Sequence, residues 1–348
     1  MATFDDYIQS LTLHSLAPNV YDGVLSGNFL THRIMNNAKT WSGESMKFAF
    51  MYRKNTSSKW YDGMDTLNTS RVNTRIRLSF EPRWFSQSVV IAGTDLDVNS
   101  TREGIIKLLG AEMETAQQSM VDSLGTDFYS LQNGKKMQGI ENISDDGTQT
   151  TTYGGQTRST YTAINGQTNA SGGTLTVSLM GTLEDDCSAG NIGPNLGVCT
   201  KPVFTIYEGL LQPTVRMNLD ISGYSQATKD GSVSSRKGLG GDIGFDQLWY
   251  RGMPMVKDEK CTSQAMYMLN EDYLAWYSLA SSRWSQVPMG SSVIDGPYAK
   301  GPNKALKLYW SGLKEPTAQD AEVGFFKIGG NLISTNPRFQ GVLTGITA

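Results

Sequence analysis

Apolar and polar side chains alternate most regularly between residues 46 and 81. From position 72 to position 80 every second residue is apolar or threonine, and the residues between them are charged or polar. This period of two predicts a half-buried strand over residues 71–81. Aromatic side chains at every second position from 48 to 52 predict another strand over residues 46–53. The two strands are expected to form a long hairpin that has almost no core of its own.

The predicted hairpin ends in a polar tip, residues 55–70, that contains the run Lys-Trp-Tyr-Asp-Gly. A two-stranded hairpin is only marginally stable by itself in water, and the next predicted element is a helix rather than further strands. Aromatic and arginine side chains dominate the energetics of protein interfaces. We therefore expect the hairpin to contact another copy of the chain. The candidate interface residues are Lys59, Trp60, Tyr61, Arg71, Arg75 and Arg77.

A long amphipathic helix is predicted after the hairpin, over about residues 101–131. Ser100 and Glu103 have the spacing of a capping box. The apolar positions that follow are three or four residues apart, which keeps them on one face of a helix. They are Ile105, Leu109, Met113, Ala116, Met120, Leu124, Phe128 and Leu131. At about 1.5 Å per residue the helix would be roughly 45 Å long and would span most of the subunit.

The remaining sequence predicts an α/β lobe followed by more strands. Residues 133–175 are rich in Gly, Thr, Ser and Asn, which indicates loops with short strands. The pattern in the lobe predicts a strand at 201–206, a short helix at 208–217 broken by Pro213, a glycine-rich loop at 223–244, a strand pair at 245–258, a buried strand at 265–269 and a helix at 271–279. Later strands are predicted at 306–310, 323–328 and 341–346.

The N-terminal 40 residues predict an arm rather than a folded unit. Leu25, Phe29, Leu30 and Ile34 are too apolar for a free tail. We expect this arm to lie on a surface, either of its own subunit or of a neighbour.

Composition narrows the classes of function. The chain has 348 residues, and its 37 glycines favour strands, turns and loops over helices. A net charge of −3 provides no global basic field for nucleic acid or an anionic membrane. The chain has no run of about 18 apolar residues that would predict a membrane span, and residues 1–10 lack the pattern of a secretory signal.

Cysteine and histidine are too sparse to suggest a metal, cofactor or catalytic centre, so we expect none of these and no enzyme activity. Three cysteines indicate reduced thiols and a cytoplasmic protein, with a Cys187–Cys199 bridge as the open alternative. The only histidines, His14 and His32, have no cysteine or carboxylate pair near them in the sequence. Acidic clusters at 145–146, 184–186 and 258–259 are expected to lie in solvated loops.

The order of predicted elements, together with three local motifs, resembles the tailed-bacteriophage major capsid protein family, which has the Hong Kong 97-type fold. Residues 245–258 read Phe-Asp-Gln-Leu-Trp-Tyr-Arg-Gly-Met-Pro-Met-Val-Lys-Asp, and residues 265–270 read Ala-Met-Tyr-Met-Leu-Asn. Residues 329–341, which begin Gly-Gly-Asn-Leu-Ile-Ser, are similar to the closing segment of several family members. The resemblance covers nearly the whole chain.

The resemblance implies an α+β fold with four parts. These are an N-terminal arm at 1–40, an extended hairpin loop at 41–92, a peripheral domain at 93–150 and 301–348 that contains the spine helix, and an α/β axial domain at 151–300. It also implies a subunit that forms the pentamers and hexamers of an icosahedral head around double-stranded DNA. The subunit would be assembled in the host bacterial cytoplasm and found in the virion, with no membrane contact. Its further partners would be a separate scaffolding protein, a portal protein and decoration proteins.

Other functions stay open at this point. An encapsulin-like bacterial compartment would use the same fold to enclose an enzyme. A β-rich glycan-binding protein would use Trp60, Tyr61, Trp249 and Trp310 as sugar platforms. Some family members cross-link a hairpin lysine to a neighbouring asparagine, and Lys54 and Lys59 lie in the corresponding region, but no asparagine partner is identifiable.

Overall fold

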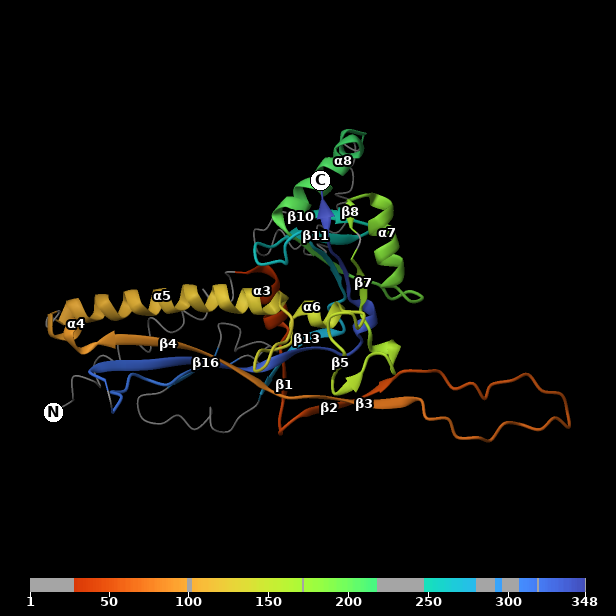
Figure 1. The fold of residues 1–348 in the computed structure, drawn as a ribbon, viewed down its shortest axis with the longest axis horizontal. Coiled ribbons are helices and arrows are strands. Elements are labelled where there is room, and N and C mark those ends of the chain that lie inside the picture. Colours follow the sequence, from red (N-terminus) through yellow and green to blue (C-terminus); the bar gives the residue numbers. More distant parts are fainter. Residues whose placement is uncertain are drawn as a thin grey trace, which may run out of the picture.

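The computed structural model describes most of the chain (Figure 1). The described residues are 28–98, 102–170, 172–217, 247–279, 292–295, 307–317 and 319–347. Most of the predicted arm, Ser100 of the predicted capping box and the predicted loop at 223–244 lie outside them. The described part has a lobe near its middle, a long helix and long strands that extend from it on one side, and a hairpin that projects on the other (Figure 1).

The predicted long helix is present as α5 (Arg102–Tyr129), which has 28 residues. Its apolar positions are buried in one hydrophobic core because the sequence repeats them every three or four residues. The buried positions are Ile105, Leu109, Met113, Ala116, Met120, Leu124 and Phe128. Leu131, the last residue of the predicted face, lies beyond the end of the helix and is half-buried.

Within the described residues, six strands form a sheet beside α5. They are β1 (Lys39–Trp41), β13 (Leu274–Leu279), β16 (Ala321–Ser334), β15 (Lys307–Trp310) and β14 (Ser292–Asp295) in this order, with β4 (Arg83–Ala92) also paired to β16. Val89 and Ile91 of β4 are buried in the core that contains the apolar face of α5. Trp84 and Val90, which alternate with them, are exposed. The predicted strands at 306–310 and 323–328 are therefore confirmed, and β16 extends further at both ends.

Another sheet, also of six strands in the part of the chain described, forms the lobe. Its order is β10 (Gln247–Tyr250), β11 (Met253–Lys257), β9 (Leu196–Cys199), β12 (Met266–Leu269), β17 (Gly341–Leu343) and β7 (Gln167–Asn169). Helices α7 (Val177–Asp186) and α8 (Lys201–Met217) pack on one face of this sheet. The predicted strand pair at 245–258 is confirmed, and it turns at Arg251 and Gly252, which both have positive φ angles, 45° and 83°. Glycine fits the second of these positions without strain.

Shorter elements make up the rest of the described fold outside the hairpin. They are α3 (Phe29–Asn36), α4 (Gly93–Val98), α6 (Ile140–Ser144), β5 (Thr152–Tyr153), β6 (Gln156–Thr157), η1 (Thr162–Ile164), β8 (Gly173–Thr174), η3 (Pro337–Phe339) and β18 (Ile346–Thr347). In α3, Phe29, Leu30 and Ile34 are buried against the core that α5 covers. This end of the predicted arm therefore lies on its own subunit.

The strand predicted at 201–206 was wrong, because this segment is the first part of α8. The helix predicted at 208–217 is confirmed as the rest of α8, but it is not broken at Pro213. Val203, Phe204 and Tyr207 are buried together, at the spacing of one helix face. The apolar run at 201–206 is too short to distinguish a strand from a helix by its period. Pro202 lies in the first turn, where proline is tolerated.

The helix predicted at 271–279 was also wrong, since Leu274–Leu279 is strand β13. This strand lies between β1 and β16 and is buried on both faces, so its side chains do not alternate. Asn270, just before this strand, accepts a hydrogen bond from the Asp272 N–H at 3.0 Å and donates one to the Gly193 carbonyl at 2.6 Å.

The chain passes between the two sheets more than once. β13, which follows the lobe strand β12, belongs to the sheet beside α5, whereas β17, near the C-terminus, belongs to the lobe. The residue boundaries expected for the four parts of the chain stay a prediction.

Candidate assembly surface

The base of the hairpin is formed by β2 (Met46–Met51) and β3 (Arg75–Phe80). The strands are antiparallel, and their register runs from Met46 opposite Phe80 to Met51 opposite Arg75. The predicted alternation is confirmed, since Leu78 and Phe80 are buried while Arg75 and Arg77 are exposed. β3 begins at Arg75, four residues later than predicted, so the paired region is shorter than the alternating sequence.

The hairpin base packs on its own subunit, which corrects the expectation that the hairpin has almost no core. The Phe80 ring meets the Tyr153 ring edge-on at 5.1 Å between centroids. The Ser79 N–H donates to the Gly154 carbonyl at 2.9 Å. A Cβ on Gly154 would lie 2.9 Å from the Phe80 ring and 3.0 Å from the Leu78 Cβ, so only glycine allows this close approach.

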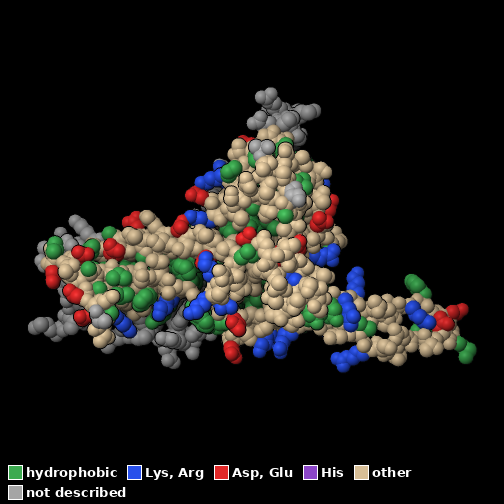
Figure 2. Space-filling view, in the orientation of Figure 1, with side chains coloured by type: hydrophobic (Ala, Val, Ile, Leu, Met, Phe, Trp, Pro, Cys, Tyr) green, Lys and Arg blue, Asp and Glu red, His purple; other side chains and the backbone are tan. Residues whose placement is uncertain are grey.

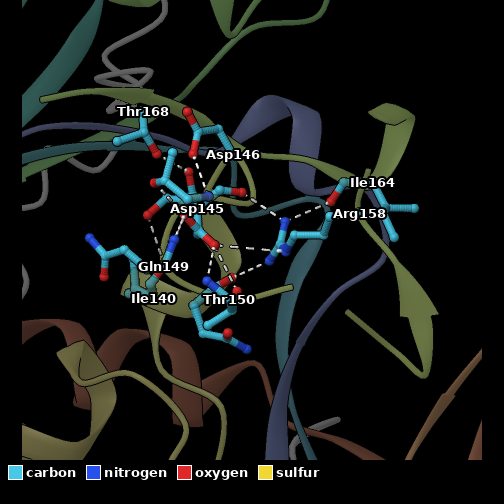
Figure 3. Close-up of polar contacts among 11 residues, drawn as sticks. Ile140, Asp145, Asp146, Gln149, Thr150, Arg158, Ile164 and Thr168 are labelled. Atoms are coloured by element: carbon cyan, nitrogen blue, oxygen red, sulfur yellow. Dashed lines mark hydrogen bonds and ion pairs between the residues drawn. The ribbon is translucent and has the colours of Figure 1, made fainter. Parts of the chain in front are cut away.

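A buried ion pair supports the turn that holds the hairpin base (Figure 3). The side chain of Arg158 is 1% exposed, and its guanidinium donates to the carbonyls of Asp145 at 2.7 Å, Asn142 at 2.5 Å and Ile164 at 3.1 Å. The Asp145 carboxylate lies 3.9 Å from the Arg158 Nε and accepts from the Thr150 N–H at 2.8 Å. These bonds close the loop between α6 and β6 into a rigid support.

The expectation that Asp145 lies in a solvated loop was therefore wrong. Burial by itself would raise the pKa of Asp145, but hydrogen bonds from Thr150 and Gln149 and the charge of Arg158 together hold the pKa below its usual value. The only sequence signal for this site was an arginine in a loop rich in small polar residues, and such an arginine is normally solvated.

Asp258, also expected to be solvated, is buried at the junction of three segments. Its carboxylate accepts from the Tyr129 hydroxyl at 2.9 Å and from the Leu30 N–H at 3.3 Å, which joins α3 and α5 to the segment after β11. Glu184 and Asp185 stay near the surface at the end of α7, where both lie within ion-pair distance of Arg251.

No described segment of the chain covers the hairpin tip. After the Tyr52 N–H donates to the Thr74 carbonyl at 3.1 Å, the two halves of the hairpin continue without strand pairing. The Trp60 side chain is 100% exposed and Tyr61 is 64% exposed. Lys59 pairs with Asp65 at 3.4 Å across the end. Hydrophobic, acidic and basic side chains gather at this far end of the molecule (Figure 2).

The structure thus brings together Lys59, Trp60 and Tyr61 but not the whole predicted set. Arg75 and Arg77 lie at the hairpin base, and Arg71 lies between base and tip. The side chains of these three arginines have no ion-pair partner among the described residues. Glu81, which directly follows β3, forms an ion pair with Arg83 at 3.7 Å. Contact of the six residues with another copy of the chain stays a prediction.

The three cysteines are buried and free, so the alternative of a Cys187–Cys199 bridge was wrong. Burial raises the pKa of the Cys187 and Cys199 thiols to about 12, which makes them unreactive at neutral pH. In the described part of the chain, no cluster of three His, Cys, Asp or Glu side chains has the arrangement of a metal site. No described helix is long and apolar enough to span a membrane.

Comparison with known proteins places the fold. No protein-family model and no curated protein matches the sequence. Among solved structures, the cyanophage A-1(L) capsid matches with a TM-score of 0.63 at 14% identity and covers 92% of this chain and 93% of its own. The chain has the tailed-phage capsid fold. The capsid of a native GTA particle also matches this chain, with a TM-score of 0.51 at 10% identity, over 90% of both chains.

The chain also matches the holo-SrpI encapsulin complex from Synechococcus elongatus PCC 7942. The TM-score is 0.51 at 11% identity, and the match covers 99% of this chain and 96% of the encapsulin chain. The α+β fold class implied by the sequence resemblance is confirmed.

Proposed function

We propose that the chain is the major capsid protein of a tailed bacteriophage. Many copies assemble into the pentamers and hexamers of an icosahedral head that encloses double-stranded DNA. The observation that carries the proposal is the hairpin tip. A subunit with the capsid fold leaves Trp60 fully exposed at the end of a projecting hairpin. An exposed apolar surface of this kind marks a binding site for a partner.

The hairpin supports assembly for an energetic reason. Its base is held by the contacts of Phe80 and Gly154, so the hairpin projects in a defined direction. A pre-positioned hairpin loses less conformational entropy on binding than a flexible one. Burial of apolar area contributes roughly 25 cal/mol per Å², and a shell repeats each contact in every subunit. A modest contact at each tip therefore stabilises a closed shell strongly.

The parts of the chain take the roles that the resemblance implies. The hairpin loop at 41–92 reaches other subunits, with Lys59, Trp60, Tyr61, Arg71, Arg75 and Arg77 as interface residues, while the described end of the arm at 1–40 stays packed on its own subunit. The peripheral domain at 93–150 and 301–348 and the axial domain at 151–300 form the wall. A net charge of −3 suits a wall that contacts DNA only non-specifically. Scaffolding, portal and decoration proteins are the further partners, with assembly in the bacterial cytoplasm before the protein resides in the virion.

An encapsulin-like compartment is the second candidate. The observation in its favour is the match to the SrpI encapsulin over 99% of this chain. The two candidates share a shell and differ in the contents. Extraction of nucleic acid from particles made in the native host would favour the phage head, whereas one co-purifying cargo enzyme would favour the compartment.

The mass of the purified chain is the first test. Multi-angle light scattering with negative-stain imaging should show megadalton shells or capsomer-sized rings, if needed after co-expression with the scaffolding protein. A chain that stays monomeric under all these conditions, with a hairpin that resists proteolysis, would contradict the proposal. Monomers or trimers that bind sugars would support the glycan-binding alternative instead.

A further inference from the structure

An apolar cavity of about 200 Å³ lies where the first residues of β4 meet the end of α5 and the strands β13 and β16. Its walls are mainly aromatic and aliphatic. The apolar lining residues are Trp84, Phe85, Leu124, Met137, Trp276 and Ile328. An apolar cavity of about 150 Å³ accommodates benzene, so this one has room for an aromatic side chain.

Two buried N–H groups of the cavity lining have no acceptor. The Trp276 Nε1 belongs to a side chain that is only 2% exposed, and it makes no hydrogen bond within the described residues. The Arg83 Nε is also buried and unpaired. A buried donor without a partner costs about 1–3 kcal/mol. Both groups are donors, and an aromatic ring offers them no strong acceptor, so the acceptor oxygens would have to come from the segment that carries the ring.

The rim of the cavity is basic. Arg83, Lys135 and Lys136 lie around it; Arg83 is paired with Glu81 at 3.7 Å and Lys136 with Asp127 at 2.7 Å. Lys135 has no carboxylate partner among the described residues. An occupant with negative charge next to its apolar part is therefore favoured.

The hairpin tip has the matching properties. Trp60 is fully exposed and provides an aromatic side chain with no contact of its own. Asp62 and Asp65 follow it within five positions, and the backbone turns there, since the Asp65 N–H donates to the Asp62 carbonyl at 2.9 Å. Lys59 pairs with Asp65, which leaves the Asp62 carboxylate available at the end of the hairpin.

We propose that the cavity receives Trp60 of a neighbouring copy of the chain, with Asp62 of that copy placed against Lys135 on the rim. A tip cannot enter the cavity of its own chain, because the hairpin base is fixed on the body and the tip points away from it (Figure 1). The inference rests on the proposed function, since it requires a shell in which hairpins reach neighbours. It adds to that function the residues that each tip recognises.

A larger groove of about 760 Å³ lies on the exposed face of the same sheet and shares Trp84 and Phe85 with the cavity. Its lining is more polar and includes Ser86, Ser311, Gln319 and the charged residues Lys314, Glu315 and Lys327. Lys314 therefore provides a matched comparison for Lys135, because both are lysines that line a hollow adjoining Trp84 and Phe85.

Cross-linking between chains tests the contact directly. The double variant Asp62→Cys/Lys135→Cys, treated with a short bis-maleimide after assembly, should give covalent multimers on a denaturing gel. The variant Asp62→Cys/Lys314→Cys should give few. The native cysteines are buried, so the wild-type chain serves as the background control.

Multimers through Lys314→Cys rather than Lys135→Cys would overturn the assignment and place the tip in the larger groove. Assembled particles that cross-link at neither position would overturn the inference and leave the proposed shell function intact. A wild-type chain that never assembles, even with its scaffolding protein, would contradict both the inferred contact and the proposed shell function.

Charge reversal gives a second readout that does not depend on introduced cysteines. Asp62→Lys and Lys135→Glu should each lower the yield of particles about two- to fivefold, as expected for a partly exposed ion pair, and the double reversal should restore most of the loss. Trp60→Ala should lose assembly while Trp60→Phe retains part of it. Single variants without effect, or a double reversal that is worse than either single variant, would contradict the pairing of Asp62 with Lys135.

Discussion

The Tyr153 hydroxyl and the backbone of Ser334 bind each other reciprocally. The hydroxyl donates to the Ser334 carbonyl at 2.7 Å and accepts from the Ser334 N–H at 3.0 Å. Because the same tyrosine packs edge-on against Phe80, it connects the hairpin base to the end of β16. The direction of the hairpin is therefore set by residues 181 positions apart in the sequence.

Replacement of Tyr153 by Phe should destabilise the subunit and loosen the hairpin. The ring contact with Phe80 is kept, but a buried N–H and carbonyl of Ser334 lose their partner, at a cost of about 1–3 kcal/mol. Urea unfolding measures the loss, and hydrogen exchange of β2 and β3 measures the loosening. Tyr52→Phe is the control, because its hydroxyl bonds the Asn73 carbonyl at an exposed site, and it should change stability by less than about 0.5 kcal/mol. Equal effects of the two variants would show that Tyr153 has no special role.

Removal of the Arg158 charge should be more costly than removal of the whole ion pair. Arg158→Leu leaves the buried Asp145 carboxylate without its cation, and the expected loss is about 3–5 kcal/mol. The double variant Arg158→Leu/Asp145→Asn removes both charges and should recover part of it. Thermal unfolding of the two variants beside the wild type makes the comparison. A double variant that is less stable than Arg158→Leu would mean that the carboxylate, through its bonds to Thr150, matters more than the pair.

Asp145 should also contribute to acid sensitivity. Its pKa is lower in the folded chain than in the unfolded chain, so its stabilising contribution is fully present above the unfolded value of about 4 and is lost as the pH falls through the folded value. Asp145→Asn should therefore reduce the loss of stability on acidification. Urea midpoints between neutral pH and about pH 3 would measure it, and an unchanged acid slope would contradict the assignment.

Deletion of the hairpin tip, residues 55–70, should separate folding from assembly. The base is held by Tyr153 and Gly154 of the same chain, so circular dichroism and thermal unfolding should match the wild type. Electron microscopy should show no closed shells. Normal shells from the truncated chain would contradict the role of the tip in assembly.

Replacement of Leu124 by Asp should disrupt the packing of α5 against the hydrophobic core. Leu124 is 1% exposed, and an unpaired carboxylate at such a site costs several kcal/mol. Gln118→Asp, at an exposed position of the same helix, is the control and should fold and assemble. Soluble expression followed by light scattering distinguishes the two variants. A Leu124→Asp chain that assembles normally would mean that the wrong helix face was assigned to the core.

The regularity of the spacing between apolar residues explains which secondary-structure predictions were confirmed. α5 and the alternation of β3 follow from the local spacing of apolar residues, which is visible in the sequence because each element has one buried and one exposed face. β13 and the first part of α8 were assigned wrongly, because β13 is buried on both faces and α8 begins with a short apolar run. In both, the tertiary neighbours decide the structure rather than the local pattern.

The sequence by itself determined the fold class, the long helix and a projecting hairpin with aromatic residues at its end. Only the tertiary structure revealed what holds that hairpin and showed the cavity that we propose as its receiving site. Asp145 and Arg158 look like solvated loop residues until the fold buries them together. The cavity beside Trp276 is assembled from segments that are far apart in the chain. Contacts of this kind depend on long-range packing, which leaves no periodic trace in the sequence.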